Sequence, residues 1–453
     1  MLEGSQRKIK HPNIIRDVQR KTEMTETKFK SVEEQLAYVK KGVAEIIPEN
    51  ELVAKLENSR KTGKPLRVYL GVDPTAPDIH LGHTVVLRKL KHFQDLGHTA
   101  VFLIGDFSAM IGDPTGVSET RPPLTREQVD ANAKTYLAQV FKTLDREKTE
   151  VRYNSEWLSK MSAEDVVRLC SHYRLARMLE REDFHSRLEK GQPISVHELL
   201  YPLLTAIDAV KLQSDVELGA TEQKFNLLVH REIQREYGLP GQAILTMPIL
   251  VGLDGQRKMS KSLGNYVGIT ESPDEIFGKI MSIPDELMWS YYELVTDRTP
   301  REIAALKNEV ADGKLHPMDA KMRLAQEVIA GFHGADAARK AAENFQRVFR
   351  DRQAPEEMQE IRFKRIAEGL CTSVHSQGGV VPLIISGSKK WSQVLTYLKL
   401  IESASEAERV IKQGGLEIDG AVVKDPTTKL DPSRAATYEL RLGKKTFLRI
   451  VVE

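Results

Sequence analysis

The sequence of 453 residues predicts an α/β protein whose largest domain is a doubly wound, parallel-sheet domain of the Rossmann-like kind. Two apolar runs, LRVYLGV (66–72) and TAVFLIGDF (99–107), are typical of buried strands, and LGHTVVLRKLKHFQDLG (81–97) between them has helical apolar spacing. A strand, a helix and a strand joined by short turns form a right-handed crossover, which places helices on both faces of a parallel sheet. A further apolar run, TMPILVGLDG (246–255), adds a later strand. We therefore assign residues 34–255 to this domain.

The segments that flank and interrupt this domain have different patterns. Residues 1–33 are polar and basic without sustained periodicity, which indicates a flexible N-terminal extension. Ser31 and Glu34 form a capping-box pattern at the start of a helix predicted over SVEEQLAYVKKGVAEII (31–47). Residues from about 122 to 200 are charged and helical in spacing, as expected of a helical insertion between the two halves of the sheet.

The C-terminal half is predicted to hold two further domains. Residues 256–375 are rich in helical apolar spacing, so we expect an α-helical domain. A glycine-rich linker is expected over residues 376–388. Residues 389–453 read as two short helices followed by strands, which predicts a small α+β domain.

Composition excludes several classes of protein. The formal net charge is only +2, which argues against a polycation but allows a local basic face. Cys170 and Cys371 lie far apart, which argues against a disulfide framework or a cysteine-based zinc site. The start lacks the apolar core of a secretory signal, and no run of eighteen apolar residues is present. We expect a cytoplasmic protein that does not engage a membrane.

The stretch YLGVDPTAPDIHLGH (69–83) places His80 and His83 around Gly82, just past a predicted strand. Zinc-binding helices usually space two histidines four apart with a carboxylate between them, so we expect no fixed metal site. A pair of core histidines is a second interpretation. The third is a polyphosphate site, because a helix N-terminus and imidazole N–H groups can both donate to phosphate oxygens. Gly82 would let a ligand approach the backbone closely, which favours the third interpretation.

The stretch RKMSKSLGNYV adds two lysines, Lys258 and Lys261, in a loop after the last predicted strand. A short basic loop by itself is usually a solvated turn. At the mouth of the same sheet as the histidine pair, however, it would supply cations to a leaving pyrophosphate. The two motifs, in this order and separated by an insertion, resemble those of the class I aminoacyl-tRNA synthetases.

Longer stretches are similar to the bacterial tyrosyl-tRNA synthetases from about Ser31 to the C-terminus. These stretches are YLGVDPTAPDIHLGH, LIGDFSAMIGDPTGVSETRPPLT, YPLLTAIDAVKLQSDVELGATEQKFNLL and KMSKS. The resemblance implies that L-tyrosine and Mg-ATP form tyrosyl-adenylate and pyrophosphate, and that tyrosine is then passed to the 3′-terminal adenosine of tRNA(Tyr). It also implies a homodimer paired through the helical insertion, with one tRNA spanning both subunits.

Tyr69 and Asp208 are the candidates for binding the substrate phenol. An unpaired carboxylate would be costly at Asp208, because YPLLTAI and AVKL on either side of it are apolar. A site built to bond a hydroxyl rejects a ring that lacks one, a discrimination for which tyrosyl-tRNA synthetases are themselves the standard example. The alternatives are an ordinary strand aromatic for Tyr69 and a surface charge for Asp208.

The same resemblance implies the remaining roles. Asp113 and Tyr201 would hold the substrate ammonium, Gln223 would face its carboxylate, and Thr205 would line the amino-acid pocket. His80 and His83 would stabilise the transition state at the α-phosphate, with Thr75 beside the adenylate and Lys258 and Lys261 on the pyrophosphate. The implied ATP-binding residues are Gly71, Asp73, His80, Gly82, His83, Gly219, Glu222, Lys258, Ser260 and Lys261.

Several positions depart from the family pattern around the presumed pocket. Thr205 replaces a glutamine, Ile207 a tyrosine, and Ala109 and Ala220 glycines; Glu222 replaces an aspartate and Val117 a basic residue. One interpretation is drift within a divergent lineage, with water bridging the lost contact. The other is a paralogue that activates a modified tyrosine or another aromatic amino acid.

The C-terminal residues 389–453 resemble the small RNA-binding fold shared by a small-subunit ribosomal protein and pseudouridine synthases, with IKQGGLEIDG as the signature. Lys389, Lys390, Arg409 and Lys412 would then contact tRNA phosphates, which position an RNA rather than specify it. A solvated charged surface is the alternative. A nonenzymatic RNA-binding protein on a synthetase scaffold is a rival function, disfavoured because HLGH and KMSKS are both whole.

Overall fold

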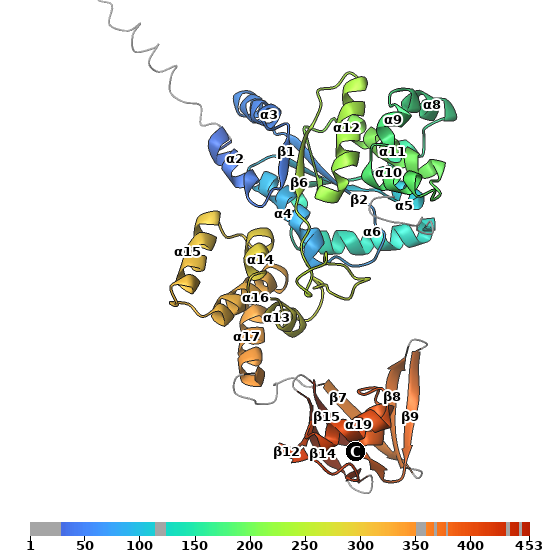
Figure 1. The fold of residues 1–453 in the computed structure, drawn as a ribbon, viewed down its shortest axis with the longest axis vertical. Coiled ribbons are helices and arrows are strands. Elements are labelled where there is room, and N and C mark those ends of the chain that lie inside the picture. The colour runs from blue at the N-terminus through green and yellow to red at the C-terminus, as the bar shows by residue number, and fades with distance from the viewer. Residues whose placement is uncertain are drawn as a thin grey trace, which may run out of the picture. The chain divides into compact units, whose positions relative to one another are not determined.

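The computed structural model describes residues 29–113, 124–349, 359–366, 369–376, 379–431, 435–443 and 446–453. The chain divides into two compact units, up to residue 339 and from residue 340 onward, and each is described by itself (Figure 1). Two features named above, most of the N-terminal extension and Val117, lie outside the described residues.

The first unit is built on a six-stranded sheet of order β1-β6-β5-β2-β3-β4. Its strands are β1 (Glu45–Ile47), β2 (Arg67–Val72), β3 (Thr99–Ile104), β4 (Thr149–Tyr153), β5 (Val216–Ala220) and β6 (Ala243–Met247). Strands β2 to β6 are parallel, and β1 adds an antiparallel edge. Because β2 lies between β3 and β5, the chain order reverses beside β2, and ligands bind such sheets at that point. The predicted doubly wound sheet is confirmed.

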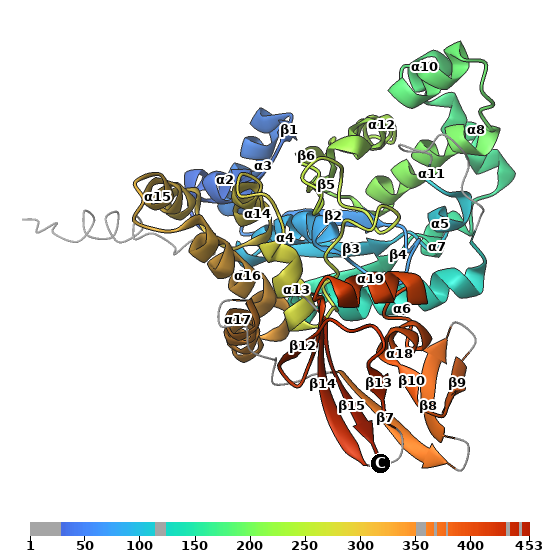
Figure 2. The same cartoon turned by 60° about the horizontal axis from the view of Figure 1, so that its bottom comes forward.

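Helices cover both faces of this sheet. The first half carries α2 (Val32–Lys40), α3 (Glu49–Thr62), α4 (Leu81–Asp95), α5 (Ser108–Ile111), α6 (Arg126–Val140) and the 3₁₀ turn η1 (Arg146–Lys148). The second half carries α11 (Val196–Leu212), the 3₁₀ turn η2 (Thr221–Gln223) and α12 (Lys224–Glu236). Helices α4 and α6 lie on one face, and α11 and α12 lie on the other (Figures 1 and 2).

The helical insertion is shorter than predicted. Helix α6 and strand β4 fall within residues 122–200, but β4 pairs with β3 and so belongs to the sheet itself. The helices that follow are α7 (Ser155–Leu158), α8 (Ala163–Ser171), α9 (Leu175–Met178) and α10 (Glu182–Glu189). The prediction missed β4 because all of its side chains are only partly buried, so the strand lacks the apolar run of its neighbours.

The start of the first unit both confirms and corrects the sequence analysis. The Glu34 N–H donates to Ser31 Oγ and the Ser31 N–H to Glu34 Oε2, which is the predicted capping box. The helix ends at Lys40, however, and the segment predicted to continue it forms β1. Gly42 takes a left-handed conformation, with φ of 63°, which ends the helical path.

Ordered packing begins before residue 34. Phe29 is only 3% exposed, and its ring stacks on His98 with 5.1 Å between ring centroids. The N-terminal extension was predicted to reach residue 33, but Phe29 already packs on the first unit.

A helical bundle completes the first unit. It contains α13 (Pro273–Met281), α14 (Met288–Val295), α15 (Pro300–Ala311), α16 (Pro317–His333) and the start of α17 (Ala335–Phe349). Lys41 Nζ donates to the Thr296 carbonyl at 2.6 Å, and the buried Lys89 Nζ donates to the carbonyls of Val39 and Lys41. These bonds join the bundle to the residues before β1 and to α4.

The second unit holds a seven-stranded sheet of order β12-β11-β14-β15-β7-β8-β9 and a two-stranded ribbon of β10 and β13. The strands are β7 (Gln359–Ile366), β8 (Gly369–Ser376), β9 (Gly379–Ser386), β10 (Lys389–Lys390), β11 (Leu416–Ile418), β12 (Ala421–Val423), β13 (Lys429–Leu430), β14 (Ala436–Leu442) and β15 (Thr446–Val452). Helices α18 (Trp391–Tyr397) and α19 (Ala404–Lys412) pack Trp391, Val394 and Ile411 into its core.

Two predictions for this region are wrong. Residues 359–366 and 369–375, expected to be helical, lie in β7 and β8, and the expected linker over 376–388 contains β9. The valines and isoleucines of GVVPLIIS favour a strand, and this preference outweighs the glycines that suggested a linker.

In the part of the chain that the structure describes, no helix is both long and apolar enough to cross a membrane.

Replacing Phe29 with alanine is expected to lower the free energy of unfolding of the first unit by about 3 kcal/mol, because it empties a buried aromatic site. Urea unfolding followed by intrinsic fluorescence measures this change. Lys30→Ala is the matched control, since Lys30 is exposed. Equal stability of the two variants would contradict the packing described for Phe29.

Candidate active site

A cavity of about 390 Å³ opens where the sheet order reverses, beside β2 and β5 and between α4, α11 and α12. Thirteen of the predicted site residues line it: Tyr69, Gly71, Asp73, Thr75, Gly82, His83, Asp113, Tyr201, Thr205, Asp208, Glu222, Gln223 and Lys258. Four others do not line it: His80, Gly219, Ser260 and Lys261. Residues far apart in the sequence thus meet in one cavity.

The two histidines cap the start of α4. Gly82 N–H donates to His80 Nδ1, and His80 N–H donates to His83 Nδ1, each at 3.2 Å. The Leu81 N–H donates to the Val267 carbonyl. The first N–H groups of the helix are therefore already bonded, whereas the sequence analysis expected them to be free to donate to phosphate. A Cβ at Gly82 would lie 3.0 Å from the His80 ring, so glycine is needed here to admit the imidazole cap.

This capping determines which ring nitrogen of each histidine carries a proton. Because both Nδ1 atoms accept, a neutral ring must carry its proton on Nε2. Burial, followed by the neighbouring His83 and Lys261 charges, lowers the pKa of His80 to about 3. Enclosure by protein and the Lys261 charge lower the pKa of His83 to about 4. Both imidazoles are therefore neutral at pH 7, with Nε2–H available as a donor.

The lysines of the KMSKS segment are paired with carboxylates at the mouth of the cavity. Lys258 Nζ lies 3.0 Å from Glu222 Oε1, and Lys261 Nζ lies 3.2 Å from Asp78 Oδ2. Lys258 is 48% exposed, so its ion pair is a weak one in water. Asn265 holds the loop by donating to the Lys258 carbonyl and accepting from the Ser260 N–H.

One end of the cavity is acidic. Asp73 accepts from Ser108 Oγ at 2.6 Å and from the Tyr201 hydroxyl at 3.0 Å, and Asp113 lines the cavity nearby. Burial and the Asp113 charge raise the pKa of Asp73 to about 7, although these hydrogen bonds oppose the shift. A Cβ at Gly105 would come within 2.0 Å of Asp73 Oδ1, so a glycine leaves room for this carboxylate.

The other end of the cavity pairs a phenol with a carboxylate. Asp208 is 4% exposed and accepts from Trp157 Nε1 at 2.7 Å and from Asn154 Nδ2 at 3.4 Å. Burial raises the pKa of Asp208 to about 8, against the lowering effect of those two donors. The buried Tyr69 hydroxyl makes no hydrogen bond of good geometry among the residues that the structure describes, although Glu217 and Gln242 lie close enough to shift its pKa. A buried hydroxyl without a partner is costly, so this end is suited to a ligand that bonds it.

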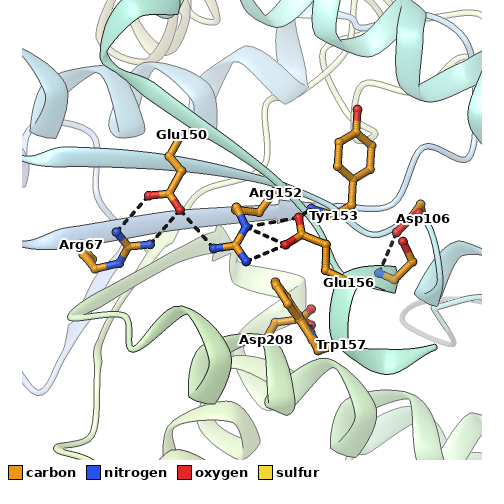
Figure 3. A network of polar contacts seen from close by, with 9 residues as sticks. Arg67, Asp106, Glu150, Arg152, Tyr153, Glu156, Trp157 and Asp208 are labelled. Atoms are coloured by element: carbon orange, nitrogen blue, oxygen red, sulfur yellow. Dashed lines mark hydrogen bonds and ion pairs between the residues drawn. The ribbon is translucent and has the colours of Figure 1, made fainter. Parts of the chain in front are cut away.

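A chain of ion pairs supports Trp157 from outside the cavity (Figure 3). The Arg152 guanidinium lies over the indole, 5.3 Å from its centroid, and bonds to both Glu150 and Glu156. Glu150 in turn pairs with Arg67 of β2. These contacts fix the ring whose N–H reaches Asp208.

The sequence analysis missed several residues of this site. Asn154 and Trp157 directly follow β4, which was itself missed. Glu217 of β5 and His230 of α12 also line the cavity and were not predicted. Asn226 and His230 lie four residues apart on α12, a spacing that places two polar side chains on one face of a helix and could have indicated that this face lines a site.

The positions that depart from the family pattern fall into two groups. Thr205 and Ala220 line the cavity, and Glu222 lines it while pairing with Lys258. Ile207 and Ala109 are buried but do not line the cavity. Gly219 packs against Leu227 and Gln223, where a Cβ would lie about 3 Å from both side chains.

The predicted RNA-binding residues lie in the second unit. Lys389 and Lys390 form β10, and Arg409 and Lys412 lie on α19 with exposed side chains. Lys390 Nζ lies 3.4 Å from Glu408 Oε1, and Arg409 lies 3.4 Å from Glu406 Oε1. Acidic neighbours thus partly balance these charges.

Comparison with known proteins agrees with this arrangement. The family model of class I tRNA synthetases (W and Y) matches residues 61–350, and that of the S4 domain matches residues 392–434. A tyrosine–tRNA ligase of Oleidesulfovibrio alaskensis is 52% identical over 93% of this chain and 99% of its own length. One of Geobacter sulfurreducens is 51% identical over the same shares.

Solved structures show the same fold. A tyrosyl-tRNA synthetase of Archaeoglobus fulgidus, complexed with L-tyrosine, has a TM-score of 0.56 at 26% identity, covering 69% of this chain and all of the other. A truncated mitochondrial tyrosyl-tRNA synthetase of Aspergillus nidulans has a TM-score of 0.59 at 22% identity, covering 71% of this chain and 94% of the other. The family match and the half-identical relatives show that the chain belongs to the tyrosine–tRNA ligase family of the class I aminoacyl-tRNA synthetases.

Proposed function

We propose that this protein activates L-tyrosine with ATP and transfers it to tRNA(Tyr). The observation that carries the proposal is the cavity in which Tyr69, whose buried hydroxyl makes no hydrogen bond of good geometry among the described residues, and Asp208 lie at one end and the acidic Asp73 and Asp113 lie at the other. A tyrosine zwitterion fits this polarity, with its hydroxyl at Tyr69 and Asp208 and its ammonium at Asp73, Asp113 and Tyr201. The names of the half-identical relatives support the same substrate.

The first step needs no nucleophile from the protein. The tyrosine carboxylate attacks the α-phosphorus of ATP, the bond to the β-phosphate oxygen breaks, and pyrophosphate leaves with the electron pair. Catalysis then rests on positioning and on charge stabilisation. The Nε2–H groups of His80 and His83 would donate to the α-phosphate oxygens, with Thr75 and Gly71 beside the adenylate. Lys258 and Lys261 would exchange their carboxylate partners for the pyrophosphate.

Mg²⁺ would enter as the ion bound to ATP and would neutralise phosphate charge. The carboxylates near the mouth, Glu222 and Asp78, are already paired with lysines, so we assign the ion to the nucleotide rather than to a fixed protein site.

In the second step the tRNA 3′-terminal adenosine takes the tyrosyl group and AMP leaves. The S4 match supports an RNA contact in the second unit, for which we propose Lys389, Lys390, Arg409 and Lys412. We also propose a homodimer that pairs through the helical insertion and works in the cytoplasm. A purely RNA-binding role is disfavoured, because the histidine and lysine motifs meet at one cavity.

Amino-acid-dependent exchange of labelled pyrophosphate into ATP tests the proposal. We expect strong exchange with tyrosine and weak exchange with phenylalanine or tryptophan. Lys258→Ala should lower the exchange rate roughly a hundredfold, since it removes a cation from the departing pyrophosphate. Lys211→Ala, an exposed lysine outside the cavity, is the control. Absence of exchange with every amino acid would overturn the proposal.

Tyr69→Phe should lower kcat/KM for tyrosine about tenfold and reduce the preference over phenylalanine, because one hydrogen bond to the substrate is lost. The melting temperature of the empty protein should change little, since the Tyr69 hydroxyl makes no hydrogen bond of good geometry among the described residues. Tyr153→Phe makes the same change outside the cavity. If both variants kept the wild-type preference, Tyr69 would not contact the substrate hydroxyl.

Tyrosine binding should release protons near pH 6.5. In the empty cavity Asp73 and Asp208 hold protons up to about pH 7 and pH 8. The ammonium and the phenol hydroxyl of tyrosine favour the ionised carboxylates and so lower both pKa values. Affinity should therefore rise from pH 6 to pH 8.

Calorimetry in two buffers of different ionisation enthalpy measures this release. The same raised pKa values make the empty protein lose stability as the pH rises from about 4 to 8, because the folded state holds protons that the unfolded chain gives up near pH 4. Asp208→Asn should reduce the proton release. Binding without proton release at pH 6.5 would contradict the assignment of both carboxylates.

A further inference from the structure

His230 lies in the wall of the amino-acid cavity and was not predicted from the sequence. It is 7% exposed and lines the cavity from α12, one turn beyond Asn226. Its Nδ1 lies 2.8 Å from Glu217 Oε1, and its Nε2 lies 2.9 Å from Thr205 Oγ1. The imidazole therefore joins α12 to β5 and to α11.

The hydrogen bonds determine the protonation of this ring. The Thr205 hydroxyl has one hydrogen, which it donates to the Tyr201 carbonyl at 2.8 Å, so it accepts from His230 Nε2–H. Glu217 accepts from His230 Nδ1–H and, through its other oxygen, from Gln242 Nε2. Both ring nitrogens thus carry hydrogen, and His230 is a cation paired with the Glu217 carboxylate.

The charges around the ring agree with this assignment. Burial alone would lower the pKa of His230, but the charge and the hydrogen bond of the Glu217 carboxylate outweigh it, so the pKa is raised.

The position of this group relative to the substrate follows from α11. Tyr201, Thr205 and Asp208 follow one another at helical spacing, and all three line the cavity. A tyrosine that spans from Tyr201 to Asp208 places its ring edge beside Thr205 and His230. Tyr69 and Glu217 are opposite one another on β2 and β5, which puts Glu217 beside the phenol end.

This wall of the cavity contains hydrogen-bond acceptors with lone pairs that its own contacts do not use. The Thr205 oxygen retains a lone pair after its two bonds, and the Asp208 carboxylate has lone pairs beyond those used by Trp157 and Asn154. A hydroxyl or amino substituent on the ring edge would find an acceptor there. A methyl group of the same size would cover those acceptors without bonding them, which costs binding.

We propose that His230 is a specificity-determining residue. By donating to Glu217 and to Thr205, it holds the Thr205 oxygen in place as an acceptor at one edge of the ring site, so the protein accepts a ring with a hydroxyl or amino group beside the phenol and discriminates against an apolar group of that size. The inference rests on the proposed function and extends it to a substrate class, tyrosines with a small hydrogen-bonding ring substituent. It also couples the departure from the family pattern at Thr205 to His230.

Pyrophosphate exchange by the full chain with tyrosine, 3-hydroxytyrosine and 3-methyltyrosine tests the inference. The measured quantity is the ratio of kcat/KM for the hydroxy and methyl compounds within one preparation, in which the fraction of active protein cancels. For the wild type we expect a ratio of about ten or more, carried by KM rather than kcat. His230→Leu should lower the ratio, because Thr205 loses the donor that holds its oxygen in place, whereas His230→Gln, which keeps an N–H donor, should retain more of it.

Two further variants provide an independent test and a matched control. Thr205→Val has nearly the same shape and removes the Thr205 oxygen, together with its bonds to His230 and to the Tyr201 carbonyl, so it should also lower the ratio even if His230→Leu folds poorly. His197→Leu makes the same substitution at an exposed histidine of α11 and should keep the wild-type ratio. A wild-type ratio near one, or an unchanged ratio in His230→Leu and Thr205→Val, would overturn the inference while exchange with tyrosine upholds the proposed function. Absence of exchange with all three substrates would overturn both.

Discussion

The cost of burying a carboxylate organises this site more than any other constraint. Asp73, Asp208 and Glu217 all line one cavity, and an isolated charge there would be expensive by several kcal/mol. Each carboxylate accepts from two donors on other parts of the chain: Ser108 and Tyr201 for Asp73, Trp157 and Asn154 for Asp208, and His230 and Gln242 for Glu217. The elements around the sheet are therefore held in register by the groups that the substrate would meet.

Because the donors to these carboxylates come from distant parts of the chain, only some residues of the site could be predicted from the sequence. Tyr69 and Asp73 were within reach because β2 is a continuous apolar strand whose carboxyl end must open on the cavity. Trp157 and His230 were not, because their roles depend on how α7 and α12 pack, and nothing local to either residue states its partner. Of the donors to these three carboxylates only Tyr201 was predicted, and of the carboxylates themselves Glu217 was missed.

The elements of the fold also fall into those with a clear local pattern, which were predicted, and those without one, which were missed. The long parallel strands and amphipathic helices have a clear period and were predicted. Strand β1 has three residues at an edge and β4 is only partly buried, so neither has a strong apolar pattern. Strand β7 joins its sheet by pairing with β15, some ninety residues later in the chain by the pairing of Gln359 with Leu448, and such non-local pairing leaves little trace in the sequence.

The two lysine–carboxylate pairs near the cavity determine what fraction of the loop is released and able to receive a nucleotide. Lys258 is tied to Glu222 after β5, and Lys261 is tied to Asp78 after β2, so one loop bridges the two halves of the sheet across the crevice. Exposed pairs of this kind contribute about 1 kcal/mol or less each. Releasing both would cost about three times the thermal energy RT at most, so the released form would be populated beside the bridged one, and added salt would shift the balance toward release.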